Sequence, residues 1–327
     1  MAIQQYANLL SFAFWKAFWL TMRPYLTFVS GAAGLVGLAF VERIEAVKFA
    51  FAFIPLFLSY GFGQALTDCF QMDTDAISSP YRPLVRGIIS RKQVLMVSLT
   101  GLALGVSIMT YLNPAVLIIG ILAVIGLLTY TKFKRFWWGG PPWNSWVVAL
   151  LPVMAILVGR EHRFGKIISL EFSTSLPFIS AVMAIFFAYG NFVVMGYLKD
   201  ISADRKTGYR TFAVVFGWRP TAIYSDIIAF LAASFTCLVL ISRVRFVIFG
   251  VVFFIIALAI NLYAQIRIHQ IRDENKAHGP IANVVRAFIL YCAAIIVSLK
   301  PYWVIFLGIF YLFFEITLKF RPEERQV

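Results

Sequence analysis

The sequence predicts an all-α protein that crosses a membrane many times. Hydrophobic residues make up 61% of its 327 positions, charged residues only 13%, and the mean hydropathy is +0.83. A soluble domain of this length does not need so much apolar surface to build its core. Apolar runs of about 20 residues, the length that spans a bilayer, also recur along the chain. We therefore expect a polytopic helical bundle with nine or ten transmembrane helices.

The first element, residues 1–22, differs from the rest. Trp15, Trp19 and Lys16 are typical of an amphipathic helix that lies at the membrane interface. No small-residue cleavage site of the signal-peptide kind follows it. Residues 23–327 are predicted to form a single transmembrane domain.

The predicted spans follow in order and are read from the apolar runs. They lie near 23–42, 47–67, 93–112, 114–131, 144–159, 176–197, 220–242, 245–267, 283–299 and 301–319. Lys300-Pro301 separates the last two runs. These runs form either two spans or one span and a re-entrant piece. Ten spans is therefore the prediction, and nine is the alternative.

The distribution of basic residues predicts the orientation. If the N-terminus, the even-numbered connections and the C-terminus share one side, that side holds 21 of the 29 Lys and Arg residues. The positive-inside rule places it in the cytoplasm. The formal net charge of +14 is explained by orientation and by contact with anionic lipid. No continuous basic patch of the kind that binds nucleic acid is apparent.

Two acidic stretches stand out, because five of the 15 Asp and Glu residues lie in them. At about 100° per residue, Asp68, Gln71 and Asp75 share one helical face. Asp200 and Asp204, spaced i, i+4, share another. Both stretches lie in connections on the predicted cytoplasmic side, at 67–92 and 197–217. Facing carboxylates suit Mg²⁺ ions whose other ligands are phosphate oxygens and water, so the sequence predicts a site for a diphosphate.

Basic residues near these stretches are candidates for contact with the diphosphate. They are Arg82, which is held between Pro80 and Pro83, and Lys199, Arg205, Lys132 and Lys134. Guanidinium and ammonium groups bind phosphate well. The alternative is that these charges only orient the protein or cap its helices.

The acidic stretches resemble the signatures of the UbiA superfamily of intramembrane prenyltransferases. Residues 67–75, Thr67-Asp68-x-x-Gln71-x-x-x-Asp75, followed by Pro80-Tyr81-Arg82-Pro83, are similar to N-D-x-x-D-x-x-x-D with P-x-R-P. Residues 199–208, from Lys199-Asp200 to Gly208, are similar to K-D-x-x-x-D-R-x-x-G. Tyr130-Thr131-Lys132 resembles the Y-[ST] feature of the family. The order and separation of these features match over nearly the whole chain.

Two positions depart from the family pattern. Thr67 stands where the family has Asn, and Gln71 stands where it has the middle Asp. Gln71 still offers a carbonyl oxygen to Mg²⁺ but removes one negative charge. A weaker metal site, a different metal stoichiometry or altered chemistry are the possible consequences. Asp73 lies about 140° from the shared face, so it joins the site only if the helix breaks nearby.

The resemblance implies a bundle around a central cavity whose cytoplasmic mouth is capped by the two acidic loops. It implies a Mg²⁺-dependent enzyme that moves a polyprenyl group from its diphosphate to a lipophilic, for example aromatic, acceptor through an allylic cation. Asp68, Asp75, Asp200 and Asp204 would be the catalytic residues, and these four with Gln71 the metal ligands.

Three polar residues near the clusters are candidates for orienting the acceptor or stabilising the cation. Tyr60 lies on the span before the first cluster, and Asn191 and Tyr197 lie toward the end of the sixth span. Asn191 could equally form hydrogen bonds between helices.

Two alternatives to the transferase remain. A terpene cyclase of the same superfamily would use the same ionisation without an acceptor. A secondary transporter would place carboxylates at mid-membrane, whereas these clusters lie at span ends. Oligomeric state is left open.

Overall fold

The computed structural model describes residues 6–159, 176–242 and 247–321, and this part of the chain is helical without strands. Residues 1–5, which open the predicted interfacial element, lie outside it. So do residues 245–246 of the predicted eighth span and the C-terminal residues 322–327.

Each of the ten predicted apolar runs is a separate helix. They are α2 (Pro24–Ala39), α3 (Ala46–Asp68), α5 (Arg91–Leu112), α6 (Val116–Lys134), α7 (Gly140–Gly159), α8 (Leu176–Gly196), α11 (Trp218–Ile241), α12 (Val247–Gln270), α13 (His278–Leu299) and α14 (Val304–Lys319). Within the described ranges, nine helices are long and apolar enough to cross a membrane, and α2 is shorter. The predicted all-α membrane bundle is thus confirmed.

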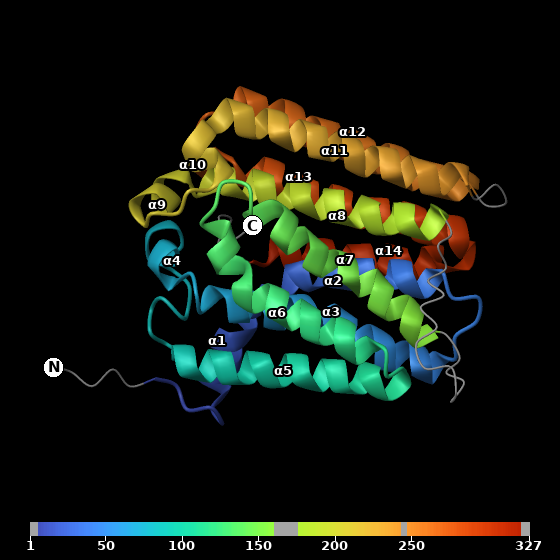
Figure 1. Cartoon of the computed structure of the whole chain (residues 1–327), viewed down its shortest axis with the longest axis horizontal. Coiled ribbons are helices and arrows are strands. Elements are labelled where there is room, and N and C mark those ends of the chain that lie inside the picture. Colours follow the sequence, from blue (N-terminus) through green and yellow to red (C-terminus); the bar gives the residue numbers. More distant parts are fainter. Residues whose placement is uncertain (1–5, 160–175, 243–246, 322–327) are drawn as a thin grey trace.

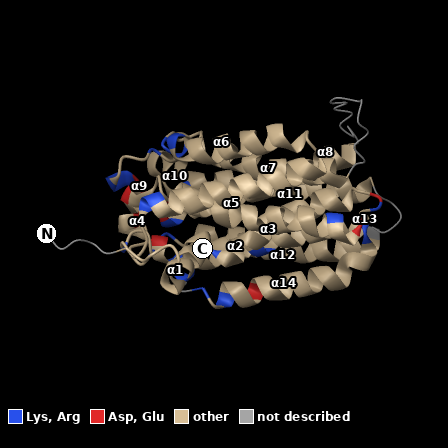
Figure 2. Cartoon of the chain, turned by 90° about the horizontal axis from the view of Figure 1, so that it is seen from below, with Lys and Arg blue, Asp and Glu red and all other residues tan. Residues whose placement is uncertain are grey.

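The long helices lie side by side, as Figure 1 shows. The short helices α4 (Met72–Ser78), α9 (Ile201–Lys206) and α10 (Phe212–Phe216) gather at one end of the bundle. Charged residues collect mostly at the two ends, while the sides are almost free of them (Figure 2). This is the charge distribution expected of helices whose middle parts lie in hydrocarbon.

The centre of the bundle is formed by α2 and α13, which pack against each other. Nearly all residues of both helices are buried. Small residues allow the close approach: a Cβ on Gly37 of α2 would overlap Pro152 of α7. Such small-residue contacts are how membrane helices pack without a hydrophobic driving force.

The N-terminal helix α1 (Phe12–Met22) begins at Ser11, whose hydroxyl oxygen accepts a hydrogen bond from the Phe14 N–H. Its buried face, including Phe14 and Phe18, packs on the side of α3. The helix ends at Arg23, where φ is +52°. No other non-glycine residue in the described ranges has positive φ. This left-handed turn, unusual for a side chain with a Cβ, directs the chain from α1 into α2.

The helix break near Asp73 that the sequence had left open is present. Helix α3 ends at Asp68, residues 69–71 form a turn, and α4 starts at Met72. The periodicity argument assumed a straight helix and could not detect this break. Asp73 nevertheless does not join the site: it is exposed, and its carboxylate pairs with Arg135 at 3.5 Å.

Candidate functional site

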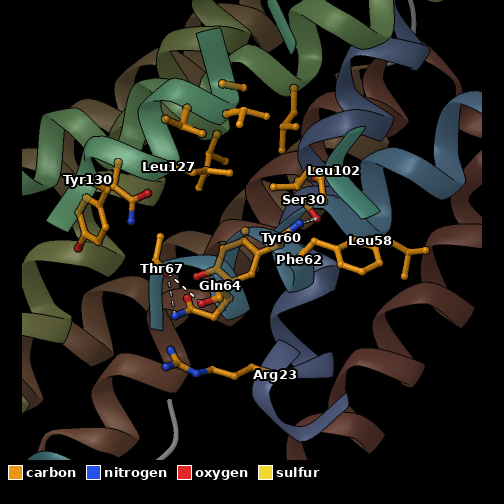
Figure 3. A pocket seen from close by; sticks show the side chains of 18 of the residues that line it. Arg23, Ser30, Leu58, Tyr60, Phe62, Gln64, Thr67, Leu102, Leu127 and Tyr130 are labelled. Carbon is orange, nitrogen blue, oxygen red and sulfur yellow. Dashed lines mark hydrogen bonds between the residues drawn. The ribbon is translucent and has the colours of Figure 1, made fainter. Parts of the chain in front are cut away.

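A cavity of about 380 Å³ opens at the end of the bundle that carries α4 and α9. Its volume lies in the range of pockets that bind small molecules. Residues of α3, α5, α6, α7 and α8 form its walls, which are mostly apolar, with Leu58, Leu102 and Leu127 among them. In Figure 3 these leucines surround one part of the cavity, while Arg23 points toward Gln64 and Thr67.

The charged side chains of the cavity belong to its mouth. They are Arg23, Asp68, Asp75, Arg82, Lys134, Lys199 and Asp200, and Gln71 lies among them. The two acidic stretches, far apart in the sequence, therefore meet at one site. The four basic groups suit an anionic ligand, and the three carboxylates suit a divalent cation.

Asp68 lies at the centre of this arrangement, at the end of α3. Arg23 Nη2 lies 3.0 Å from Asp68 Oδ1, and Arg82 Nη1 lies 3.5 Å from the same oxygen. Gln64 Nε2 donates a hydrogen bond to it at 2.7 Å. The side chain of Asp68 is only 4% exposed, so these partners compensate a charge that burial would otherwise penalise.

Asp75 pairs with Arg82 on the loop that follows α4. Burial raises the pKa of the Asp75 carboxyl to about 6, although the Arg82 guanidinium opposes the shift. Arg82 thus contacts both Asp68 and Asp75, and its side chain is only 10% exposed. A guanidinium held in this way presents its remaining N–H groups in a fixed geometry suited to phosphate.

The second acidic stretch is organised by Lys134, at the end of α6. Lys134 Nζ lies 3.2 Å from Asp204 Oδ1 and donates to Gln71 Oε1, also at 3.2 Å. Burial raises the pKa of the Asp204 carboxyl to about 6, with Lys134 opposing the shift. Asp204 is completely buried and does not line the cavity, whereas Asp200 does.

Hydrogen bonds hold the two acidic loops together. The hydroxyls of Thr74 in α4 and Thr207 after α9 lie 2.9 Å apart.

Glu274, in the connection before α13, accepts hydrogen bonds from the N–H and the hydroxyl of Ser202 in α9. A carboxylate at the first turn of α9 is favourable because the helix N-terminus carries partial positive charge.

Tyrosines line the cavity next to the charged mouth. Tyr189 donates a hydrogen bond to the Tyr60 hydroxyl at 3.2 Å, and Asn144 Nδ2 donates to Tyr189 at the same distance. The hydroxyls of Tyr130 and Tyr197 lie 3.3 Å apart. The four tyrosines therefore belong to the cavity wall together with the charged residues of its mouth.

Besides Asp204, three of the predicted site residues lie outside the cavity wall. Lys132 and Arg205 are exposed and do not line the cavity. Asn191 is buried between helices, where its Oδ1 accepts hydrogen bonds from Ser225 and Gln265 and its Nδ2 donates to Asn261. Asn191 thus connects α8 with α11 and α12, which is the alternative that the sequence had left open.

Sequence reasoning missed Arg23, Gln64 and Asn144. Arg23 was assigned to the N-terminal interfacial helix, and its partner Asp68 is 45 positions away. The one available signal was Pro24 directly after it, which marks a helix boundary.

The residues at the mouth were tested for their fit to Mg²⁺. No group of three or more His, Cys, Asp and Glu side chains in the described part of the chain is arranged to hold a metal. Yet Asp68, Asp75 and Asp200 and the Gln71 carbonyl all face one cavity. Mg²⁺ commonly takes one or two carboxylates and fills its remaining positions with substrate phosphates and water. The oxygen donors present fit that mode.

A membrane-spanning bundle whose apolar cavity ends in paired acidic and basic groups has the architecture of an intramembrane enzyme. The model of the UbiA prenyltransferase family matches residues 25–289. The chain belongs to this family and is a prenyltransferase of the UbiA type.

Comparison with individual proteins agrees with this assignment. Digeranylgeranylglyceryl phosphate synthase of Pyrococcus abyssi is 27% identical over 216 residues, which cover 65% of this chain and 73% of the relative. The protein of the same name from Thermococcus kodakarensis is 25% identical over 292 residues, 87% of this chain and 98% of the relative.

Solved structures show the same fold. A UbiA homologue from Archaeoglobus fulgidus bound to DMAPP and Mg²⁺ aligns with a TM-score of 0.62 at 17% identity, over 85% of this chain and 98% of that one. The structure of a UbiA homologue from that organism with GPP and Mg²⁺ gives a TM-score of 0.64 at 18% identity, over 86% and 99%.

Proposed function

We propose that this enzyme binds a polyprenyl diphosphate with Mg²⁺ at the mouth of the cavity and transfers the prenyl group to a lipophilic acceptor. The observation that supports it best is the meeting of Asp68, Asp75 and Asp200 with Arg23, Arg82 and Lys199 at one end of an otherwise apolar cavity. The polar end suits the diphosphate, and the apolar walls suit the prenyl chain.

Each set of side chains has a separate task in this proposal. Asp68, Asp75 and Asp200 would hold the metal, which neutralises charge on the leaving diphosphate when bound. Arg23 and Arg82, anchored on those carboxylates, would turn their free N–H groups to the phosphate oxygens. The rings of Tyr60 and Tyr189 would face the allylic carbon and stabilise its positive charge, and the apolar walls would keep water away.

The acceptor is inferred from the relatives. Both proteins compared by sequence bear the name digeranylgeranylglyceryl phosphate synthase. We therefore infer that a glyceryl phosphate carrying an isoprenoid chain is the first acceptor to test, with a phenolic acceptor as the comparison. The cyclase remains an alternative because Gln71 alters the first signature. Membership of an enzyme family leaves the transporter without support.

The experiment incubates purified protein with Mg²⁺ and prenyl diphosphates of several lengths, with and without each acceptor, and measures pyrophosphate and lipid products. We expect pyrophosphate only when an acceptor is present. A cyclic hydrocarbon formed without acceptor would favour the cyclase instead. No pyrophosphate under any condition would contradict the proposal.

Substitutions of three aspartates test which carboxylates the reaction needs. Asp68→Asn and Asp200→Asn should each abolish turnover, because each removes a carboxylate from the cavity. Asp73→Asn is the matched control, since Asp73 lies in the same loop but faces solvent. Wild-type rates in Asp68→Asn, or equal losses in all three variants, would overturn the site assignment.

We also infer that the mouth faces the cytoplasm. The acidic loops and the N-terminus lie on the side that holds 21 of the 29 Lys and Arg residues, and these residues decide orientation.

A further inference from the structure

A second pocket, of about 590 Å³, lies outside the site at the mouth. It forms where the connection between α2 and α3, at the opposite end of the bundle (Figure 1), meets the connection between α13 and α14. Lys300 Nζ donates a hydrogen bond to the backbone carbonyl oxygen of Glu42 at 2.6 Å and so joins the two connections. The residues that line this pocket are all different from those of the cavity that contains Asp68 and Asp200. The two sites are therefore separate.

The polar part of the pocket wall suits an anion. Arg43 and Lys300 are its basic residues and Glu42 is its acidic one, while Glu45 is exposed just outside the wall. An ammonium can donate more than one hydrogen bond, so Lys300 can contact a ligand while it holds the Glu42 carbonyl. Ala46, the first residue of α3, also lines the pocket, and a helix N-terminus carries partial positive charge. Two cationic side chains and a helix N-terminus thus meet at one pocket, and each of them favours a phosphate.

The remainder of the wall is aromatic and apolar. Phe49 of α3, Phe306 of α14 and Trp303 line it. The ring centroids of Phe49 and Trp303 are 5.4 Å apart, and those of Phe49 and Phe306 are 6.3 Å apart. Tyr302, also in the wall, is exposed, and Tyr and Trp are enriched where a membrane meets water. The neighbouring Ile305 is 75% exposed, as expected of a side chain in hydrocarbon, so the pocket lies at the boundary between head groups and acyl chains.

An anionic phospholipid matches both parts of this wall. Its phosphate would lie beside Arg43 and Lys300 at the level of the head groups, and an acyl chain would lie on Phe49 and Phe306 in the hydrocarbon. A free phosphate ion would leave the aromatic part of the wall uncovered, and an acidic peptide would have to place its backbone in the bilayer. Basic pockets between transmembrane helices bind lipid head groups in other membrane proteins. Charge and depth together therefore favour a lipid.

We propose that this pocket is a binding site for one anionic phospholipid from the leaflet opposite the mouth. The lipid phosphate binds Arg43 and Lys300, and one acyl chain packs between α3 and α14. The bound lipid bridges the two connections and so fastens α14, which packs mainly on α2, to the rest of the bundle. No step of the proposed prenyl transfer involves this site, so the inference stands or falls independently of that function.

Native mass spectrometry tests the proposal by counting bound lipids. The purified full chain is delipidated in detergent and titrated with dioleoyl phosphatidylglycerol or with dioleoyl phosphatidylcholine, which has the same acyl chains and a zwitterionic head group. We expect one phosphatidylglycerol per chain to bind about 10-fold more tightly than phosphatidylcholine, because basic residues near an anionic lipid contribute to its binding. Glycerophosphoglycerol, the same head group without acyl chains, should not displace the lipid at equal concentration. Equal affinity for the two lipids, no bound lipid, or displacement by the head group alone would overturn the proposal.

Substitutions of basic residues test whether the lipid binds in this pocket. Arg43→Gln and Lys300→Gln should each weaken phosphatidylglycerol binding about fivefold, and the double variant about 25-fold, because each removes one charge near the lipid phosphate. Lys48→Gln is the matched control, since it removes the same charge from the first turn of α3 but lies outside the pocket wall. Its effect should be less than about twofold.

Arg43→Gln is the more decisive of these variants, because Lys300→Gln also removes the hydrogen bond to Glu42. Thermal unfolding of each variant in phosphatidylcholine shows whether it is folded. An unchanged affinity for phosphatidylglycerol in folded Arg43→Gln would overturn the proposal. An equal loss of affinity in Lys48→Gln would overturn it as well, since general surface charge would then account for the binding.

Discussion

At the scale of single residues, Arg23 shows how backbone conformation serves the site. Its φ of +52° lies in the left-handed region, which costs about 1–2 kcal/mol for a residue other than glycine. The turn joins α1 to α2 and brings the guanidinium to Asp68. Observed strain of this kind supports a functional role, because packing must maintain it.

Two substitutions separate the backbone of Arg23 from its side chain. Arg23→Gly relaxes the turn and removes the guanidinium, whereas Arg23→Ala removes the guanidinium and keeps the strain. A hydrogen bond to a charged group contributes about 1.5–3 kcal/mol, so both should lower kcat/KM for the prenyl diphosphate by about 10- to 100-fold. Steady-state kinetics measures this, with exposed Lys16→Ala as the control. Full activity in Arg23→Gly would show that only the turn matters.

At Tyr60, substitutions can separate the contribution of the aromatic ring to the reaction from that of the hydroxyl. Its hydroxyl accepts a hydrogen bond from Tyr189, so that group is already engaged by the protein, while the residue lines the cavity. If the ring stabilises the cation, Tyr60→Phe should stay within about threefold of wild type. Tyr60→Leu should lose about 3- to 30-fold in single-turnover rate, the equivalent of a cation–π contact of up to about 2 kcal/mol. Tyr263→Leu on the exposed side of α12 is the control. Equal losses of single-turnover rate in Tyr60→Phe and Tyr60→Leu would assign the role to the hydroxyl.

At the scale of elements, hydropathy located the helices well and the site less well. The apolar runs predicted ten helices correctly because a spanning helix can be recognised from its own residues, which are apolar over the length of a bilayer. The break after Asp68 was only a possibility in the sequence, because the angular argument treated residues 68–75 as regular helix. Lys132 and Lys134 looked equivalent in the sequence, but two positions turn a helix by about 200°, so one is exposed and the other buried. Arg23 was missed because no local pattern predicts a partner 45 residues away.

The pairing of α4 with α9 carries the site, since it brings the two acidic stretches together. The hydroxyls of Thr74 and Thr207 are 2.9 Å apart, so the two side chains point toward each other, as a disulfide between these positions requires. Thr74→Cys with Thr207→Cys, in a chain whose three cysteines are replaced, should therefore form a crosslink with a mild oxidant. Electrophoretic mobility before and after reduction measures it.

The control for this crosslink is Thr74→Cys with Thr236→Cys, because Thr236 is buried in the middle of α11. Absence of a crosslink in the first pair, or its presence in both, would contradict the close approach of the two loops.

At the scale of the whole molecule, the asymmetry between the two ends connects fold with chemistry. One end carries α4, α9 and the mouth of the cavity, and the other carries connections such as the one between α2 and α3 (Figure 1). A water-soluble diphosphate group can enter only from the mouth, whereas the prenyl chain partitions into hydrocarbon. The exposed Ile54, Leu104 and Ile108 also line the cavity, so under the proposed function the prenyl chain would have direct contact with the lipid side.

The orientation of this asymmetric molecule is the final prediction. Ser202 is exposed in α9, and Glu42 is exposed in the connection between α2 and α3 at the opposite end. In a chain without other cysteines, Ser202→Cys should react with a membrane-impermeant maleimide only in inside-out vesicles, and Glu42→Cys only in right-side-out vesicles. The physical reason is that translocating the basic connections of the mouth end is unfavourable, which keeps them in the cytoplasm. Labelling of both positions from one side would contradict a spanning bundle, and the reverse pattern would place the diphosphate site outside the cell. The expected pattern places Asp68 and Asp200 on the side where cells supply both Mg²⁺ and prenyl diphosphates.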